Sequence, residues 1–390
     1  MKNIVGAPTK RENFYKRDKI INRIYRRLDA GNHLLLAAPR RVGKTSIMLY
    51  LEEFPREGYE CIYVYVESIH DPELFYATIS KALLNSNALK KRSKASKHLG
   101  DLFEGVLKRI SKVEILGTGV ELNHEQEDGN VFLDLQKMMQ ELEKSEETVV
   151  IMLDEFPGLI ENIKKKHGIE AATFFLQQNR ALRQETSENV KFIYTGSVGL
   201  QTIVKQISSM SVINDINTLV IPPLTPAEGK ELATLLLDYQ KVPYQENAID
   251  YLLERIRWLA PFYIQLLIQE VIDWYEDKEK EIDCSAIDAA FQKALNVRNT
   301  QYFSPMIERL KMRYPERDRQ DFVLSILDQI ADKDGLSLSA IQEIGEAKEL
   351  EDWNAILDLL VFEGYINDDN QDKIYTFNSP LLLLWWRKNR

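Results

Sequence analysis

The chain has 390 residues, 44% of them hydrophobic and 28% charged, with a formal net charge of -10. These proportions are typical of a globular protein, and the length allows two or three domains. The apolar runs are too short to span a membrane, and the N-terminus lacks the apolar core of a secretory signal. The acidic balance argues against a surface that binds nucleic acid throughout. Because Cys61 and Cys284 lie far apart, we expect unpaired thiols in a reducing cytoplasm.

Basic residues are concentrated near the N-terminus. Between Met1 and Thr45 the only acidic residues are Glu12, Asp18 and Asp29. We predict an extended arm over residues 1–17, followed by a helix that begins at Asp18 and ends near Asp29.

The next stretch has the pattern strand, loop, helix. His33–Ala37 predicts a buried strand, and the residues from Ser46 onward predict the first turns of a helix. A loop that ends in Gly-Lys-Thr between a strand and a helix is typical of phosphate binding. Its backbone N–H groups and the helix N-terminus attract phosphate, Lys44 adds a positive charge, and the Thr45 hydroxyl is a ligand for Mg²⁺. The predicted ATP-binding residues are Ala38, Pro39, Arg40, Arg41, Val42, Gly43, Lys44, Thr45 and Ser46.

Two features near this loop leave alternatives open. The usual pattern begins with glycine, and Ala38 in its place predicts a slightly altered entry into the loop. The segment Phe14–Arg17 precedes the loop in the chain, and an aromatic ring with an arginine there could cover the adenine base. Alternatively, the basic helix is solvated and simply packs on the core.

The region after the loop begins regularly and then becomes irregular. Cys61–Glu67 predicts a second buried strand, and Asp71–Asn85 predicts a helix. The basic run Lys90–Lys97 could contact nucleic acid, although a solvated linker fits it better. We predict a helix at Leu102–Ile110 and a hairpin with a glycine turn over 113–122. Residues 88–128 therefore resemble an insertion in a nucleotide-binding core.

An amphipathic helix predicted over Phe132–Leu142 precedes an apolar run that ends in two acids. Val149–Leu153 predicts a buried strand, with Asp154 and Glu155 at its C-terminal end. Ligands bind at this end of the strands in a parallel sheet. Asp154 could hold Mg²⁺ through water, and Glu155 could orient and deprotonate an attacking water molecule. A core strand that happens to end in acids is the alternative, which the upstream loop disfavours.

Two further segments could sense phosphate. Arg180 and Arg183 lie on a helix predicted over 171–184, and either could reach the γ-phosphate of a neighbouring subunit as an arginine finger. Ordinary solvation of a helix surface is the alternative. The strand predicted over 191–197 ends in small polar residues, and a hydroxyl there could sense the γ-phosphate. The candidates are Thr195 and Ser197.

A last core strand, Leu219–Ile221, leads into an all-helical stretch. Thr225 caps a helix that has Pro226 at its first position. Four helices are predicted between residues 227 and 295, and we interpret 226–300 as a helical lid beside the nucleotide. Pro261 opens the third helix and could lie against the base. The core then covers 1–225.

Residues 301–390 predict three helices followed by a β-hairpin, which is the order of a winged-helix domain. Winged helices suggest DNA binding by analogy. However, Glu349 to Asp372 contains no Lys or Arg and many acids, whereas a helix that enters DNA needs positive charge. We therefore expect this face to contact protein, or the lid in one nucleotide state. We expect the tail Pro380–Trp386 to pack on a neighbouring domain.

Three segments, Ala38–Thr45, Val149–Glu155 and Phe192–Ser197, together with Phe14–Arg17 and the Pro-Leu-Thr after the last strand, resemble a known group. They are similar to the AAA+-related, archaeal-type ATPases of the STAND class. The resemblance covers about residues 10 to 300, and the winged-helix tail also fits. It implies an α/β P-loop NTPase fold of the ASCE/AAA+ type that binds ATP and Mg²⁺ and hydrolyses ATP slowly. It also implies that Arg17 lies near the adenine, although Lys16 replaces the glycine often found before that arginine.

Three functions follow from these patterns. The first is a regulatory ATPase whose nucleotide state changes the lid and tail and so controls a protein partner or self-association. The second is a DNA-binding ATPase module in DNA transactions or in mobile-element or defence systems, using the basic arm, Lys90–Lys97 and Arg309–Arg319. The third is a nucleotide-binding scaffold without turnover. None of the three uses a membrane.

Overall fold

The computed structural model describes residues 1–390 except 96–103, 110–129, 187, 197–198, 315 and 368–372. The chain packs as two compact units. The first, here called the sheet unit, contains Lys16–Ala37 and Lys44–Ile221. The second, here called the helical unit, contains Met1–Tyr15, Ala38–Gly43 and Pro222–Arg390. Ser197 and the hairpin predicted over 113–122 lie outside the described residues.

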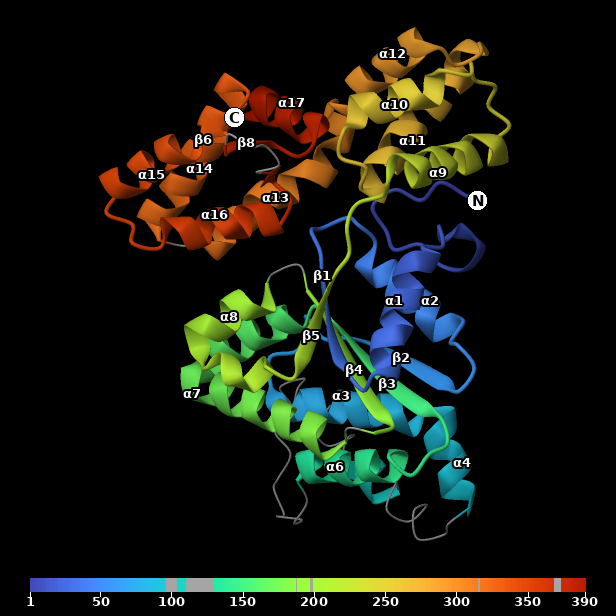
Figure 1. The fold of residues 1–390 in the computed structure, drawn as a ribbon, viewed down its shortest axis with the longest axis vertical. Coiled ribbons are helices and arrows are strands. Elements are labelled where there is room, and N and C mark those ends of the chain that lie inside the picture. The colour runs from blue at the N-terminus through green and yellow to red at the C-terminus, as the bar shows by residue number, and fades with distance from the viewer. Residues whose placement is uncertain (96–103, 110–129, 187, 197–198, 315, 368–372) are drawn as a thin grey trace. The chain divides into compact units, whose positions relative to one another are not determined.

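The sheet unit is built on five parallel strands in the order β2-β3-β4-β1-β5 (Figure 1). They are β1 (His33–Ala37), β2 (Tyr59–Tyr65), β3 (Thr148–Asp154), β4 (Val190–Thr195) and β5 (Ile216–Val220). Buried parallel strands need apolar side chains on both faces, which explains why β1, β3 and β4 are mostly apolar. Since β4 lies between β1 and β3 and all three are parallel, their carboxyl ends lie side by side, with polar residues at the ends of β3 and β4.

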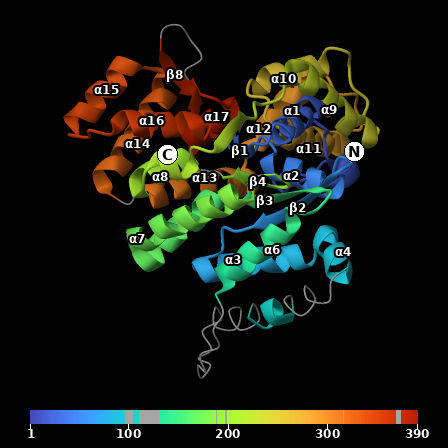
Figure 2. The ribbon, with the colours of Figure 1, turned by 60° about the horizontal axis from the view of Figure 1, so that its bottom comes forward.

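Helices cover both faces of this sheet. Figure 2 shows α1 (Asp18–Asp29) and α2 (Lys44–Glu53) on one face, and α3 (Pro72–Leu84), α6 (Val131–Leu142) and α7 (Phe156–Glu185) on the other. Side chains of α3, α6, α7 and α8 (Leu200–Ile207) form one hydrophobic core with alternate residues of β2, β3 and β4. The sheet unit also contains α4 (Asn87–Ala95), a helical segment at 104–109 and a short 3-10 helix, η2 (Met210–Ile213).

Helix α7 (Phe156–Glu185) is interrupted at Gly168, and the part after this residue agrees with the helix predicted over Ala171–Gln184. It begins at Phe156, directly after the acidic end of β3. It is kinked at Gly168, whose φ of +88° is not helical. Pro157 stands in its first turn, where the missing N–H costs nothing. The part before Gly168 was not predicted, because Pro157, Gly158 and Gly168 normally interrupt a helical sequence pattern.

In the helical unit, four helices follow the sheet strands in the chain. They are α9 (Pro226–Tyr239), α10 (Ala248–Ile256), α11 (Pro261–Lys278) and α12 (Cys284–Ala294), close to the predicted bounds. The Thr225 side chain accepts a hydrogen bond from the Glu228 backbone, and Glu228 accepts one from the Thr225 backbone, so α9 begins with a capping box. Pro226 and Pro261 each open a helix, as predicted.

The C-terminal part has the predicted order of helices and hairpin, with additional helices. A small sheet there has the strand order β6-β8-β7, and its strands β7 and β8 lie between the last two helices in the chain. Trp386 donates a hydrogen bond to Asp328, and Trp385 stacks on Phe303. The tail therefore packs within the C-terminal part, and it also contacts the preceding helices, since α17 (Pro380–Asn389) lies against α10 and Lys388 donates to the Leu295 carbonyl. Helix α13 was missed because Pro305 lies inside it. The elements are η3 (Val297–Asn299), α13 (Thr300–Arg313), α14 (Arg317–Lys333), β6 (Leu336–Ser337), α15 (Leu338–Ala347), α16 (Trp353–Phe362), β7 (Ile366–Asn367), β8 (Ile374–Phe377) and α17 (Pro380–Asn389).

No helix among the described residues is long and apolar enough to cross a membrane. Cys61 is buried and Cys284 is half-buried, and both are free thiols, as predicted. Near the N-terminus, the predicted extended arm contains one short 3-10 helix, η1 (Arg11–Asn13).

Candidate phosphate and metal site

Three hydroxyl groups donate hydrogen bonds to the carboxylate of Asp154. Thr45 Oγ1 lies 2.7 Å from Oδ2, and Tyr63 Oη lies 3.0 Å from the same oxygen. Thr195 Oγ1 donates to the other oxygen, Oδ1. Asp154 is 2% exposed and Thr195 is fully buried. The structure thus brings together three of the predicted site residues, Thr45, Asp154 and Thr195, in the sheet unit.

Strand register explains why these groups meet. Met152 pairs with Tyr63 on one side and with Ile193 on the other. Because side chains alternate along a strand, Asp154 and Thr195, two residues beyond Met152 and Ile193, lie on the same face as Tyr63. Helix α2 covers this face, and its second residue is Thr45.

The local chemistry keeps Tyr63 a hydrogen-bond donor. Burial raises the pKa of its phenol, and the neighbouring charge of Asp154 raises that pKa further. The group therefore stays protonated at neutral pH and can donate to the carboxylate.

Tyr63 was missed by sequence reasoning. The run Cys61–Glu67 predicted only a buried strand, because nothing local to it shows that β2 pairs with β3. A tyrosine that interrupts an apolar strand beside an acid-ended strand is the signal that could have found it.

Lys44 and Glu155 are the chain neighbours of two residues of the cluster, Thr45 and Asp154. Lys44 is the first residue of α2 and is 8% exposed. Glu155 caps α7 with a left-handed backbone, φ +61°, and its side chain is half-buried. An unusual backbone at a predicted catalytic position is a reason to propose function there. Glu155 also follows Asp154 directly, so both acids lie at the carboxyl edge of the sheet.

Loop 38–43 connects β1 to α2 and has the backbone of a tight turn. Gly43 has φ +94° and Arg41 has φ +69°. Ala38 is 2% exposed, so the methyl group that replaces the usual glycine is accommodated in a buried position. Val42 is also buried, while Pro39 and Arg40 are half-buried. Ser46, in the first turn of α2, is buried.

Within the helical unit, the side chain of Arg41 lies against aromatic rings. Its guanidinium carbon is 3.8 Å from the centre of the Phe262 ring, at the start of α11. The guanidinium also donates a hydrogen bond to the backbone carbonyl of Tyr302, in α13. Burial lowers the pKa of this guanidinium. The contacts fix the side chain of a residue that sequence reasoning assigned to phosphate binding.

The two predicted adenine-binding residues lie in different units. Arg17 is 4% exposed and precedes α1 in the sheet unit. Pro261 is half-buried at the start of α11 in the helical unit. Their role at the base stays a prediction.

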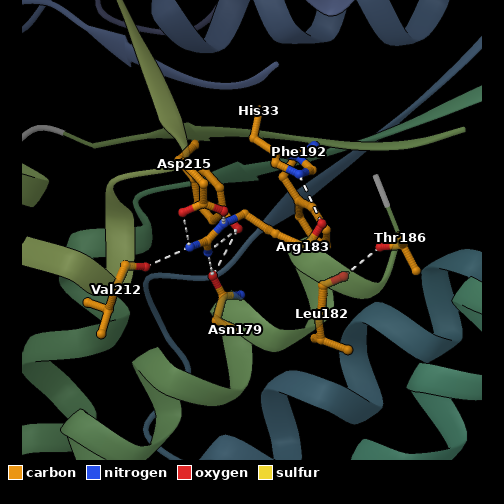
Figure 3. Close-up of polar contacts among 9 residues, drawn as sticks. His33, Asn179, Leu182, Arg183, Thr186, Phe192, Val212 and Asp215 are labelled. Carbon is orange, nitrogen blue, oxygen red and sulfur yellow. Dashed lines mark hydrogen bonds and ion pairs between the residues drawn. The ribbon is translucent and has the colours of Figure 1, made fainter. Parts of the chain in front are cut away.

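Arg183 occupies the interior of the sheet unit (Figure 3). It is 1% exposed, forms an ion pair with Asp215 at 2.7 Å, and also donates to Asn179, to Tyr194 and to the Val212 carbonyl. Every guanidinium nitrogen of Arg183 has a partner, so its geometry disfavours an arginine finger. Arg180, one turn earlier, is half-buried, and its Nε has no hydrogen-bond partner among the described residues.

The oxygen donors of the cluster fit Mg²⁺. Magnesium prefers hard oxygen ligands and is usually held by one or two protein groups together with water and substrate phosphates. The Thr45 hydroxyl and a carboxylate oxygen of Asp154 are 2.7 Å apart, which is close enough for both to bind the same cation. Thr45 and Asp154 are therefore the residues that would hold the metal, which would offset the charge of bound phosphates.

The comparisons with known proteins agree on this fold. The Walker-type ATPase PABY2304 of Pyrococcus abyssi matches with a TM-score of 0.62 and 19% identity, over 99% of this chain and 100% of that one. The ORC2 protein of Aeropyrum pernix, solved as ADPNP–ADP complexes, matches with a TM-score of 0.52 and 12% identity, over 97% and 96% of the two chains. No family model and no curated protein matches the sequence. The predicted α/β P-loop ATPase fold is confirmed.

Proposed function

We propose that the protein binds ATP with Mg²⁺ and hydrolyses it slowly, as a regulatory ATPase of the AAA+/STAND type. The observation that carries this proposal is the convergence of Thr45 and Thr195 on the carboxylate of Asp154. A hydroxyl after the phosphate loop, an acid at the end of β3 and a hydroxyl at the end of the intervening strand form a set that suits a metal-bound triphosphate. The similarity of the fold to the Walker-type ATPase of Pyrococcus abyssi supports it.

Each predicted residue then has a defined role. The backbone of loop 38–43 and the N-terminus of α2 bind the phosphates, and Lys44 offsets their charge. Thr45 and Asp154 hold Mg²⁺, and Thr195 senses the γ-phosphate. Glu155 orients the attacking water and accepts its proton. Arg180 is the remaining candidate for an arginine finger.

The regulatory part of the proposal concerns the helical unit. Residues 226–300 act as a lid, and 301–390 act as a winged-helix domain whose acidic face contacts a protein partner or a second copy. Differential contacts with ATP and ADP bias the arrangement of these parts. The contacts of Arg41 with α11 and α13 support this coupling, since they tie a phosphate-loop side chain to the helical unit.

Release of phosphate from ATP by the wild type and by Glu155→Gln tests the catalytic assignment. We expect turnover in the wild type and a loss of roughly 100-fold in the variant, the usual scale for a general base. Glu170→Gln is the matched control, because Glu170 is exposed on the same helix and outside the cluster. Equal and negligible release from wild type and Glu155→Gln, with nucleotide still bound, would leave a binding scaffold.

Binding of DNA is the weaker candidate, since the charges of the C-terminal part do not favour it. The basic residues of Arg309–Arg319 include three that form ion pairs within this part: Arg313 with Glu363, Arg317 with Asp321, and Arg319 with Asp352. A salt-dependent shift of duplex DNA in a gel, with a slope that implies several phosphates, would support it.

A further inference from the structure

Tyr63 contacts the metal-binding carboxylate from a strand that carries none of the predicted site residues. Its hydroxyl donates to Asp154 Oδ2, the oxygen that also accepts from Thr45. Tyr63 lies on β2 at the edge of the sheet, opposite Met152 of β3. Tyr63 is half-buried.

These bonds fix the direction of the carboxylate. A free carboxylate turns about its terminal bond, and a metal ligand that must first be oriented binds more weakly. Thr195 holds Oδ1 and Tyr63 holds Oδ2, so the plane of the group is defined at both oxygens. The bond from Thr45 does not serve this purpose once its hydroxyl ligates the cation.

We propose that Tyr63 is a positioning residue, which holds the Asp154 carboxylate in the orientation that receives Mg²⁺ and so sets the Mg²⁺ concentration at which ATP binds. This assignment rests on the proposed function. The phenol does not ligate the cation itself and takes part in no proton transfer.

Binding of a fluorescent ATP analogue, titrated with Mg²⁺, tests the assignment in Tyr63→Phe. We expect the midpoint in Mg²⁺ to rise on the order of tenfold, the scale for loss of a group that orients a metal ligand. Affinity measured in EDTA stays unchanged, because no phosphate contact is removed. Tyr65→Phe is the matched control on the same strand, since its hydroxyl donates to Glu67. Tyr63→Met, which fills the space without a donor, shows the same rise.

The outcomes separate the positioning role of Tyr63 from the proposed function of the protein as an ATPase. An unchanged Mg²⁺ midpoint in both Tyr63 variants, with Mg²⁺-dependent binding by the wild type, overturns the positioning role alone. A wild type that binds no nucleotide overturns the proposed function, and this assignment with it. A rise in Tyr65→Phe equal to that in Tyr63→Phe also overturns the role of Tyr63, because the effect would then belong to the strand.

Loop 38–43 is held by residues that lie far along the chain in the helical unit. Arg41 stacks on Phe262 and bonds to the carbonyl of Tyr302. Gly364, which follows α16 with φ +82°, lies so close to loop residue Pro39 that an added Cβ would be 2.8 Å from it. The same Cβ would be 2.7 Å from Trp258. Side chains of the loop thus meet α11, α13 and the turn after α16.

Arg41 has a strained backbone and a buried donor without an acceptor among the described residues. A non-glycine residue at φ +69° carries backbone strain, and the buried Nη1 of Arg41 has no hydrogen-bond partner among the described residues. An unpaired buried donor costs free energy that an arriving acceptor can recover. The loop is therefore able to rearrange when phosphate oxygens become available.

We infer that Arg41 links the phosphate loop to α11 and α13, so that phosphate bound by the loop loosens these helices. The inference deepens the proposed switch and rests on it only for the nucleotide-dependent part. In the nucleotide-free protein, the cation–π contact with Phe262 and the hydrogen bond to the Tyr302 carbonyl hold the helices to the loop. This part of the inference does not require that the loop binds phosphate.

Hydrogen–deuterium exchange over 261–275 and 300–313 tests the link in the wild type and in Arg41→Gly. Glycine accepts the positive φ, so the variant removes the side chain while it relieves the backbone. Without nucleotide, we expect several-fold faster exchange in both segments of the variant. With ATP and Mg²⁺, we expect exchange to rise in the wild type and to change little in the variant.

Arg41→Lys separates stacking from charge, because an ammonium group cannot stack as a plane. We expect it to resemble Arg41→Gly. Identical exchange in wild type and Arg41→Gly without nucleotide overturns the link. Faster exchange in the variant without nucleotide, together with no response of the wild type to ATP, keeps the contact and overturns its nucleotide dependence.

Discussion

His33 shows how a single buried side chain can make stability depend on pH. The Phe192 N–H donates to its Nδ1 at 3.1 Å, so the ring proton is on Nε2, which lies 3.2 Å from the Arg183 carbonyl (Figure 3). A second ring proton would have to displace the Phe192 N–H. Burial, and then the charge of Arg183, lower the pKa of His33 to about 4.

Acidification is therefore expected to destabilise the sheet unit through His33. The folded-state pKa lies below the unfolded value near 6.5, so the contribution of His33 is complete above pH 6.5 and is lost as the pH falls towards 4. Between pH 7 and pH 5 we expect a loss on the order of 2 kcal/mol. Urea unfolding of wild type and His33→Gln at the two pH values measures it. The unfolding free energy of His33→Gln should fall less than that of the wild type between the two pH values, by on the order of 2 kcal/mol. Equal losses in the two proteins would contradict the account.

The site residues differ in how far a sequence can reveal them. Lys44 and Thr45 follow a local motif, and Asp154 ends an apolar run, so neighbouring residues alone indicate their role. Arg183 was offered either as an arginine finger or as a solvated helix residue, because helical periodicity does not show that Asp215 will pair with it. Tyr63 required the strand order, which depends on contacts between segments distant in the chain.

Among the elements, the strands were predicted best, while helix α13 and the first part of α7 were missed. Buried parallel strands are apolar and short, so β1, β3 and β4 stand out in the sequence. Helix α13 continues past Pro305, whereas Gly168 does interrupt α7 and separates its unpredicted first part from its predicted second part. Local preference thus failed where packing across the unit overrides it.

Helix α9 gives a prediction at the scale of one element. Its capping box satisfies backbone donors at the helix start through Thr225 and Glu228. Thr225→Ala removes one acceptor, and we expect the free energy of unfolding of the helical unit to fall by about 1 kcal/mol. Thr225→Ser keeps the hydroxyl and serves as the control. Urea unfolding followed by circular dichroism measures both variants, and equal midpoints for the two would show that the cap contributes nothing.

At the scale of the whole molecule, the residues assigned to nucleotide binding are divided between two compact units. The sheet unit holds Thr45, Asp154, Thr195 and Tyr63, while loop 38–43 packs with the helical unit. The chain nevertheless runs from β1 through this loop into α2 without interruption. The proposed coupling of nucleotide state to the helical unit therefore depends on this loop, whose residues belong to the helical unit and join two elements of the sheet unit in the chain.

Binding of a fluorescent ATP analogue, with Mg²⁺ and with EDTA, to wild type, Lys44→Ala and Asp154→Asn tests the central claim most directly. We predict that Lys44→Ala binds roughly 100-fold more weakly, about 2.7 kcal/mol, in both conditions. Asp154→Asn should bind the analogue with the same affinity as the wild type in EDTA. Mg²⁺ should not raise the affinity of this variant as it does that of the wild type. Equal affinities in all three proteins, or a wild type that binds no nucleotide, would contradict the account.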